Sequence, residues 1–266
     1  MNTKKNNLVF YIALIICALI CIWAVGFNQS FTAASSAMFT FFTTDFGWLY
    51  CAAMLAFVFF AVFIAFSKWG NIRLGEDQEK PEYSTLSWFA MLFGCGMGVG
   101  LVFWGVAEPL SFYLRPAAGI TPSSPDAANF AVKAAYMHWG VSPWANYSVI
   151  GLALAYFGFR KKKKGMISTT LIPLIGEERA EGWLGTLVDI LAVFATVAGI
   201  VTSLGLGVMQ INSGLHMVLG LPSNITVQII IIVLISVIYI WTAASGIEKG
   251  IKAISDVNLY LFVGLM

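Results

Sequence analysis

Long apolar runs separated by short polar stretches dominate the pattern of the chain. A helix of about 20 residues crosses about 30 Å of hydrocarbon, so each apolar run of that length predicts a membrane span. Complete spans are predicted near residues 8–27, 47–66, 86–108, 138–159, 184–211 and 225–244. A seventh apolar run begins near Asp256 and is cut short at Met266. The pattern predicts an all-α membrane protein.

Two polar stretches between the spans are not predicted to cross the membrane. Residues 125–137 are opened by a Ser-Pro-Asp helix start signal and predict a short interfacial helix. Residues 176–182, "GEERAEG", are too charged to enter hydrocarbon. The first span, in contrast, is longer than the apolar part of a signal peptide and predicts a signal anchor.

Composition agrees with a membrane location and excludes a nucleic-acid partner. Hydrophobic residues make up 59% of the 266 residues and charged residues 11%, and the mean hydropathy is +0.83. The 15 basic residues nearly balance 13 acidic ones. Cys17, Cys21, Cys51 and Cys95 lie in apolar runs without metal-ligand spacing and are predicted to be packing residues.

The distribution of Lys and Arg predicts the orientation of the spans. Only Arg115 and Lys133 lie in one set of loops, and the other 13 of the 15 basic residues lie in the opposite set. Positive residues are retained on the cytoplasmic side, so a multi-pass protein of the cell (inner) membrane with a cytoplasmic N-terminus is expected. The "RKKKK" run at residues 160–164 is either a stop-transfer anchor or a site for anionic lipid or a partner.

Glycines on alternate positions interrupt the third predicted span, in "GCGMGVGLVFWGVAEP" at residues 94–109. Each glycine inside a helix costs about 1 kcal/mol relative to alanine, so local unwinding near the membrane midplane is expected. Unwound backbone could supply carbonyl groups to an ion or a substrate. The same glycines also form overlapping GxxxG pairs, which favour close helix packing. The residues alone leave both interpretations open, and no strand supports a nucleotide-binding loop.

Three stretches in matching order resemble the betaine/choline/carnitine transporter family. They are "GMGVGLVFWGVAEPL" at residues 96–110, "HWGVSPWANYSVIGLALAY" at residues 138–156 and "AVFATVAGIVTSLGLGVMQINSGL" at residues 192–215. The resemblance covers essentially the whole chain. It implies an inverted-repeat secondary transporter fold of twelve helices, in which two peripheral helices precede two five-helix repeats. Residues 1–85 would supply the peripheral pair, and residues 86–266 the first repeat, truncated in the seventh span.

The resemblance also implies sodium-driven uptake of glycine betaine or a related trimethylammonium compatible solute for osmoprotection. A quaternary ammonium has no N–H to donate, so aromatic faces are its suitable neutral partners. Trp139 and Tyr147 would lie on the fourth span about 80° apart around the axis and face one cavity, and Trp144 is assigned to the interfacial belt. The implied substrate-binding residues are Gly96, Met97, Gly98, Gly100, Phe103, Trp139 and Tyr147.

Sodium is the coupling ion that the resemblance implies, and no other cofactor is expected. The carbonyls of Gly94 and Met97 would contribute to one site, and Thr196 matches the first hydroxyl of a second. Ile200 stands where relatives place the other hydroxyl, and either Thr202 or Ser203 would have to compensate. Choline carriers tend to place Asp where this chain has Gly100, which favours a zwitterionic substrate here.

Several alternatives and expected absences complete the predictions. The alternatives are a choline or carnitine carrier or exchanger, an ion channel, and a membrane fragment without function. An enzyme is not expected, because no nucleophile and base share one depth. His138 and His216 lack metal-ligand spacing, and Glu108 and Asp189 are expected to be structural. A homo-oligomer is compatible with the sequence, and the 266 residues alone are not expected to transport, since they hold one repeat.

Overall fold

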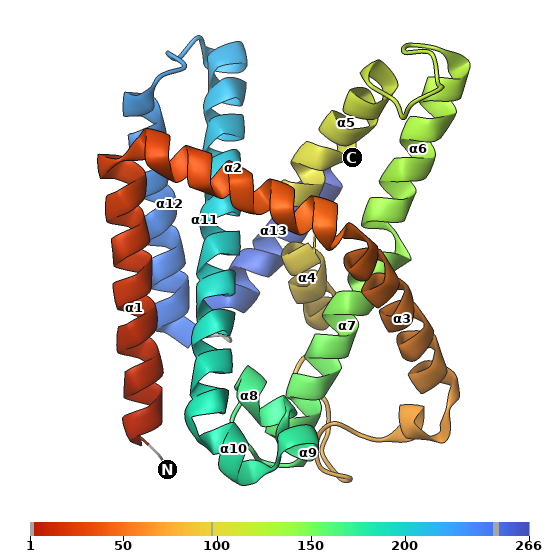
Figure 1. The fold of residues 1–266 in the computed structure, drawn as a ribbon, viewed down its shortest axis with the longest axis vertical. Coiled ribbons are helices and arrows are strands. Elements are labelled where there is room, and N and C mark those ends of the chain that lie inside the picture. The colour runs from red at the N-terminus through yellow and green to blue at the C-terminus, as the bar shows by residue number, and fades with distance from the viewer. Residues whose placement is uncertain (1–2, 97, 247–249, 266) are drawn as a thin grey trace. The chain divides into compact units, whose positions relative to one another are not determined.

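The computed structural model describes residues 3–96, 98–246 and 250–265, and every regular element in these ranges is helical (Figure 1). The long helices are α1 (Thr3–Gly26), α2 (Asn28–Asp45), α3 (Gly47–Phe66), α4 (Thr85–Gly96), α5 (Val99–Leu114), α6 (Pro125–Trp139), α7 (Val141–Ala155), α11 (Trp183–Leu219), α12 (Ile225–Gly246) and α13 (Lys252–Leu265). Shorter pieces are η1 (Lys68–Asn71), η2 (Tyr156–Arg160), α8 (Ile167–Thr170), α9 (Ile172–Ile175) and α10 (Glu177–Glu181). The predicted all-α class is confirmed.

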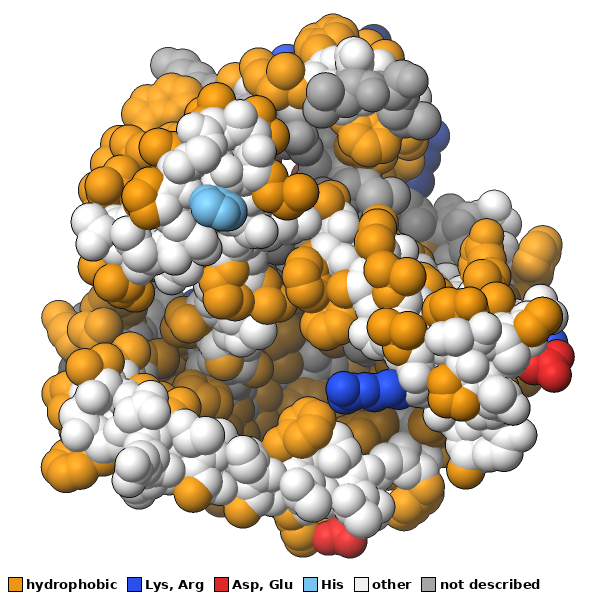
Figure 2. Space-filling view, turned by 90° about the horizontal axis from the view of Figure 1, so that it is seen from above, with side chains coloured by type: hydrophobic (Ala, Val, Ile, Leu, Met, Phe, Trp, Pro, Cys, Tyr) orange, Lys and Arg blue, Asp and Glu red, His pale blue; other side chains and the backbone are white. Residues whose placement is uncertain are grey.

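Four described helices are long and apolar enough to cross a membrane. They are Lys5–Gly26, Gly47–Phe66, Trp183–Leu219 and Ile225–Gly246, and they match four of the predicted spans. Large apolar side chains on these helices are exposed, and Figure 2 shows apolar groups spread over the face that it draws. A surface of this kind is suited to contact with lipid, and the protein is a multi-pass membrane protein.

The third predicted span is a bent pair of helices. Its two parts, Thr85–Gly96 and Gly100–Leu114, meet at an angle of 48° and together are long and apolar enough to cross a membrane. Breaks of this sort are found where backbone is satisfied by protein or lines a cavity. The predicted interruption of the helix at the glycine segment is thus confirmed.

The fourth predicted span differs from the structure. Helix α6 extends to Trp139, and α7 begins only at Val141, so Gly140 separates them. The amide of Gly140 donates to the carbonyl of Tyr136 at 2.9 Å, and a Cβ at this position would overlap that same carbonyl oxygen. The prediction that Trp139 and Tyr147 share one helix is therefore wrong, because the chain turns at a glycine between them.

The chain divides into two compact units, which are described separately. The first comprises Met1–Glu79 and Tyr136–Ala198, and in it α3 packs against α7. The second comprises Lys80–Ala135 and Gly199–Met266, and in it α4 packs against α13. The predicted boundary at residue 85 concerns the repeats of the transporter fold and stays a prediction.

Small residues supply most of the buried positions in both units. The buried apolar side chains include Ala13, Ala90, Ala127, Ala131, Ala145 and Ala180. In lipid, small residues let helix backbones approach closely, because no difference in polarity drives apolar helices together. Aromatic contacts add to this packing, for example between Phe93 of α4 and Phe262 of α13, whose ring centroids are 4.8 Å apart.

The basic run at residues 160–164 binds acidic residues of this chain. Arg160 donates to the Gly75 carbonyl at 2.9 Å and pairs with Asp77 at 2.7 Å. Lys162 pairs with Glu76 at 2.9 Å, and Lys163 pairs with Glu177. The basic run and its partners at residues 75–77 and at Glu177 must therefore lie on the same side of the membrane, as the charge distribution predicts.

The hydrogen bond from Arg160 lowers the pKa of Asp77, and the one from Lys162 lowers the pKa of Glu76. Because the folded pKa is lowered, the stabilisation is complete above the ordinary carboxyl pKa and is lost as the pH falls through the folded one. We expect spin labels at Leu74 and Lys164 to show a broader distance distribution below pH 3.8, the ordinary pKa of Asp77, than at pH 7. Arg160→Gln should broaden it already at pH 7, and an unchanged distribution in both cases would contradict the contact.

Candidate functional site

The glycine segment of the second unit forms the break between α4 and α5. Helix α4 ends at Gly96, and Gly98 is extended, with φ −78° and ψ −176°, just before α5. Its carbonyl accepts from the amides of Leu101 and Val102 at 3.1 and 3.2 Å, so this oxygen caps the first turn of α5. Met97, predicted for both substrate and sodium, lies outside the described residues.

Gly94 and Gly98 have different surroundings. A Cβ at Gly94 would lie 3.5 Å from the hydroxyl oxygen of Ser255 on α13, whereas a Cβ at Gly98 would meet nothing within 4 Å. Gly94 therefore belongs to the packed face of α4, as the GxxxG interpretation predicts. Gly98 is glycine for a reason other than packing against the described residues.

Gly100 and Phe103 follow in the first turns of α5. Phe103 is half-buried, and its ring meets that of Trp104 edge to face, with centroids 5.1 Å apart. Both predicted residues thus lie directly after the helix break and within the same unit as Gly96 and Gly98. Their predicted roles at the substrate stay predictions.

The predicted aromatic residues lie in the first unit, around the turn at Gly140. Trp144 donates its ring N–H to the carbonyl of Trp139 at 3.2 Å, and its ring lies 5.9 Å from that of Tyr147. Trp139 and Trp144 also line an open surface groove of about 420 Å³ between α3 and α7. Trp144, which was predicted to belong to the interfacial belt, thus contacts both Trp139 and Tyr147. Its spacing of three residues from Tyr147 is the sequence feature that could have indicated the second contact.

Thr196 lies on α11, in the part of the helix that belongs to the first unit. Its hydroxyl donates to the carbonyl of Ala192 at 2.8 Å, a common bond for hydroxyl groups in membrane helices. Thr196 and Asp189 are among the residues that line an open groove of about 260 Å³. Ile200, one turn further, is 53% exposed and has no oxygen to offer a cation.

Among the residues that the structure describes, no group of three or more His, Cys, Asp or Glu side chains is arranged to hold a metal ion. Each unit carries its own candidate groups: the second has backbone at a helix break, and the first has aromatic faces and a hydroxyl group. These are groups for binding a cation or a zwitterion.

The family profile described as "BCCT, betaine/carnitine/choline family transporter" matches residues 8–266. The chain belongs to this transporter family. Its members are transporters and not enzymes, which confirms the resemblance and the expected absence of enzyme activity.

Several similar transporters carry names for compatible solutes. The "Probable glycine betaine transporter" of Desulfitobacterium hafniense is 43% identical over 99% of this chain and 53% of its own length. The glycine betaine transporter OpuD of Bacillus subtilis is 44% identical over 97% and 50%. The ectoine/hydroxyectoine transporter of Virgibacillus pantothenticus is 43% identical over 97% and 51%. The chain spans about half the length of these relatives.

Proposed function

We propose that this chain serves sodium-coupled uptake of glycine betaine or a related trimethylammonium solute, as an osmoprotective membrane transporter. One observation supports the proposal most: the break at Gly98 lies in a chain that is 43–44% identical to transporters named for glycine betaine. Broken helices bring free backbone groups to the membrane midplane, where secondary transporters bind ions and substrates.

The chemistry of the named residues fits a zwitterion. The faces of Trp139, Trp144 and Tyr147 can attract a trimethylammonium group, which has no N–H. Gly100 leaves no carboxylate to compete with that of the substrate, and the backbone N–H groups of the glycine segment suit an anion. Gly94 and Thr196 are the described residues of the proposed sodium sites.

Uptake in cells that lack betaine carriers tests the proposal. We expect cells that express a complete carrier containing this chain to accumulate labelled glycine betaine saturably in sodium medium. They should lose most of that uptake when N-methylglucamine replaces sodium, and the 266 residues expressed alone should give no uptake above the empty-vector control. An excess of unlabelled betaine, carnitine, choline and ectoine, each in turn, ranks the substrates; ectoine is included because of the relative named for it. Unitary currents without accumulation would instead indicate a channel.

Trp139→Leu should weaken glycine betaine binding about 2- to 30-fold. Leucine keeps the apolar volume but loses the aromatic face, which contributes about 0.5–2 kcal/mol to one cation contact. The half-saturation constant for uptake measures the effect. Trp48→Leu is the control, because Trp48 is 70% exposed on α3. If the loss of any exposed tryptophan weakened uptake, this variant would show the same change in the half-saturation constant. Equal constants for both variants would return Trp139 to the interfacial belt.

The charge distribution predicts that residues 160–183 face the cytoplasm and residues 109–137 face outside. In a variant without native cysteines, we expect an impermeant thiol reagent to label Ser123→Cys on intact cells and to label Lys162→Cys only after permeabilisation. Labelling of Lys162→Cys on intact cells would reverse the proposed orientation.

A further inference from the structure

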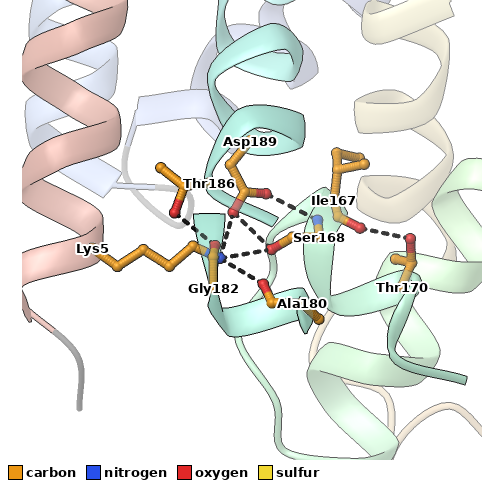
Figure 3. Close-up of polar contacts among 8 residues, drawn as sticks. All are labelled: Lys5, Ile167, Ser168, Thr170, Ala180, Gly182, Thr186 and Asp189. Carbon is orange, nitrogen blue, oxygen red and sulfur yellow. Dashed lines mark hydrogen bonds and ion pairs between the residues drawn. The ribbon is translucent and has the colours of Figure 1, made fainter. Parts of the chain in front are cut away.

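The ammonium group of Lys5 is enclosed by oxygen atoms from three different elements of the first unit (Figure 3). Its Nζ lies 3.0 Å from Oδ2 of Asp189, 3.2 Å from the hydroxyl of Ser168 and 2.9 Å from the carbonyl of Ala180. The side chain of Lys5 is 8% exposed and that of Asp189 is 2% exposed. A buried charge of this kind is tolerated only when it is paired and hydrogen-bonded.

The acceptors are themselves held in place. Ser168 donates its amide to Oδ1 of Asp189 at 2.9 Å and its hydroxyl to Oδ2 at 2.7 Å. The carbonyl oxygen of Ala180 lies so close to Gly185 that a Cβ there would overlap it. Both carboxylate oxygens of Asp189 therefore accept hydrogen bonds from Ser168, which fixes their positions beside the ammonium group.

We propose that these oxygens form a binding site for a primary ammonium group, which Lys5 occupies as a tethered ligand and which latches the start of α1 to α8, α10 and α11. An ammonium has three N–H donors, and the site presents three acceptors within hydrogen-bond distance of one nitrogen. Three donors matched to three acceptors distinguish this site from an ion pair that has a single contact.

A cavity leads to the site. This cavity has a volume of about 180 Å³. Its lining residues include Lys5, Ser168 and Ala180, together with basic residues of the 160–164 run. Two of those basic residues, Lys162 and Lys163, are paired with Glu76 and Glu177. Shortening the side chain of Lys5 would leave space in this cavity for a small ammonium compound beside the acceptors.

The latch holds the helix that carries Thr196. Thr196 lies seven residues after Asp189, which is about two helical turns and nearly the same face of α11. Opening the site would free the first turns of α11 and uncover the α8–α10 segment. This inference does not depend on which solute is transported.

Chemical rescue of Lys5→Ala tests the proposal in the purified protein. The variant lacks three carbons and the ammonium group, which n-propylammonium replaces. We expect the unfolding midpoint in detergent to fall by roughly 5 °C or more, and n-propylammonium to restore it saturably. Tetramethylammonium at the same concentration carries the charge but no N–H and should restore nothing.

Thiol accessibility tests the latch in membranes, where purification is not needed. Without native cysteines, Thr169→Cys on α8, which is 8% exposed, should react several-fold faster when Lys5→Ala is added, and n-propylammonium should slow it again. In Asp189→Asn the rate should rise without any slowing by n-propylammonium. Lys164→Ala is the matched control, because Lys164 lines the same cavity without an ion pair among the described side chains, and it should leave the rate unchanged.

Two results would overturn the proposal. One is equal restoration by tetramethylammonium and n-propylammonium, which would reduce the site to a general charge effect. The other is additivity: if Lys5→Met and Asp189→Asn lower the midpoint independently, so that the double variant shows the full sum, the two groups are not coupled.

Discussion

Leucine at Gly98 should abolish glycine betaine uptake while leaving membrane insertion and the unfolding midpoint nearly unchanged. Among the residues that the structure describes, none has an atom within 4 Å of a Cβ at this position, and its φ of −78° is accessible to any residue. The protein should therefore fold with a side chain in the space that the break leaves open. If that space holds substrate, a branched side chain blocks it.

Gly94→Leu is the contrasting variant. Its Cβ would already contact Ser255, and the added methyl groups have to push against α13, so the unfolding midpoint should fall together with uptake. Uptake and expression measured in parallel separate the two positions. Normal uptake with Gly98→Leu would contradict the proposed role of Gly98 at the substrate.

Replacing Asp189 with alanine should have the largest effect on stability, lowering the free energy of unfolding by about 3–5 kcal/mol. The substitution leaves the ammonium of Lys5 buried without its counter-charge and removes the acceptor for both donors of Ser168. Denaturant unfolding in detergent measures the loss.

Asp77→Ala is the control for this effect. Its carboxylate also pairs with a basic side chain, but it is 74% exposed, and water replaces the lost partner. We expect little change for Asp77→Ala. A comparable loss for both variants would mean that burial does not decide the contribution of these pairs.

Hydropathy predicted the uninterrupted spans well, because length and apolar content alone determine them. Residues 47–66 were predicted and form α3 with the same bounds, and residues 225–244 form α12 with two more residues. Helix α2 received no prediction, since its Ser, Thr and Phe residues give no continuous apolar run. The structure also begins α13 at Lys252, four residues before the predicted start.

The turn at Gly140 and the neighbours of the glycine segment depend on contacts that hydropathy does not contain. The apolar run continues through Gly140, and only the approach of the Tyr136 carbonyl explains the glycine. Alternating glycines did predict the helix break. That Gly94 packs against α13 and Gly98 does not could be seen only from the position of α13. Clustered glycines mark a special backbone without saying which neighbour demands it.

The pairing of Lys5 with Asp189 could not be read from the sequence either. Charge counting placed Lys5 among the loop cations, and Asp189 was expected to be structural without a partner being named. The structure gives it one, on a helix at the other end of the chain. A buried cation needs acceptors, and here they come from three different helical elements. A local sequence pattern does not show that these elements meet.

Gly185 links the shape of the backbone to this charge. The oxygen that its missing side chain leaves room for is the Ala180 carbonyl that accepts from Lys5. Even the smallest substitution, Gly185→Ala, would have to move that oxygen or the start of α11. A neutral methyl group would thus displace an acceptor of the Lys5 ammonium without touching the ammonium itself, so the close packing at this helix junction fixes the position of one acceptor.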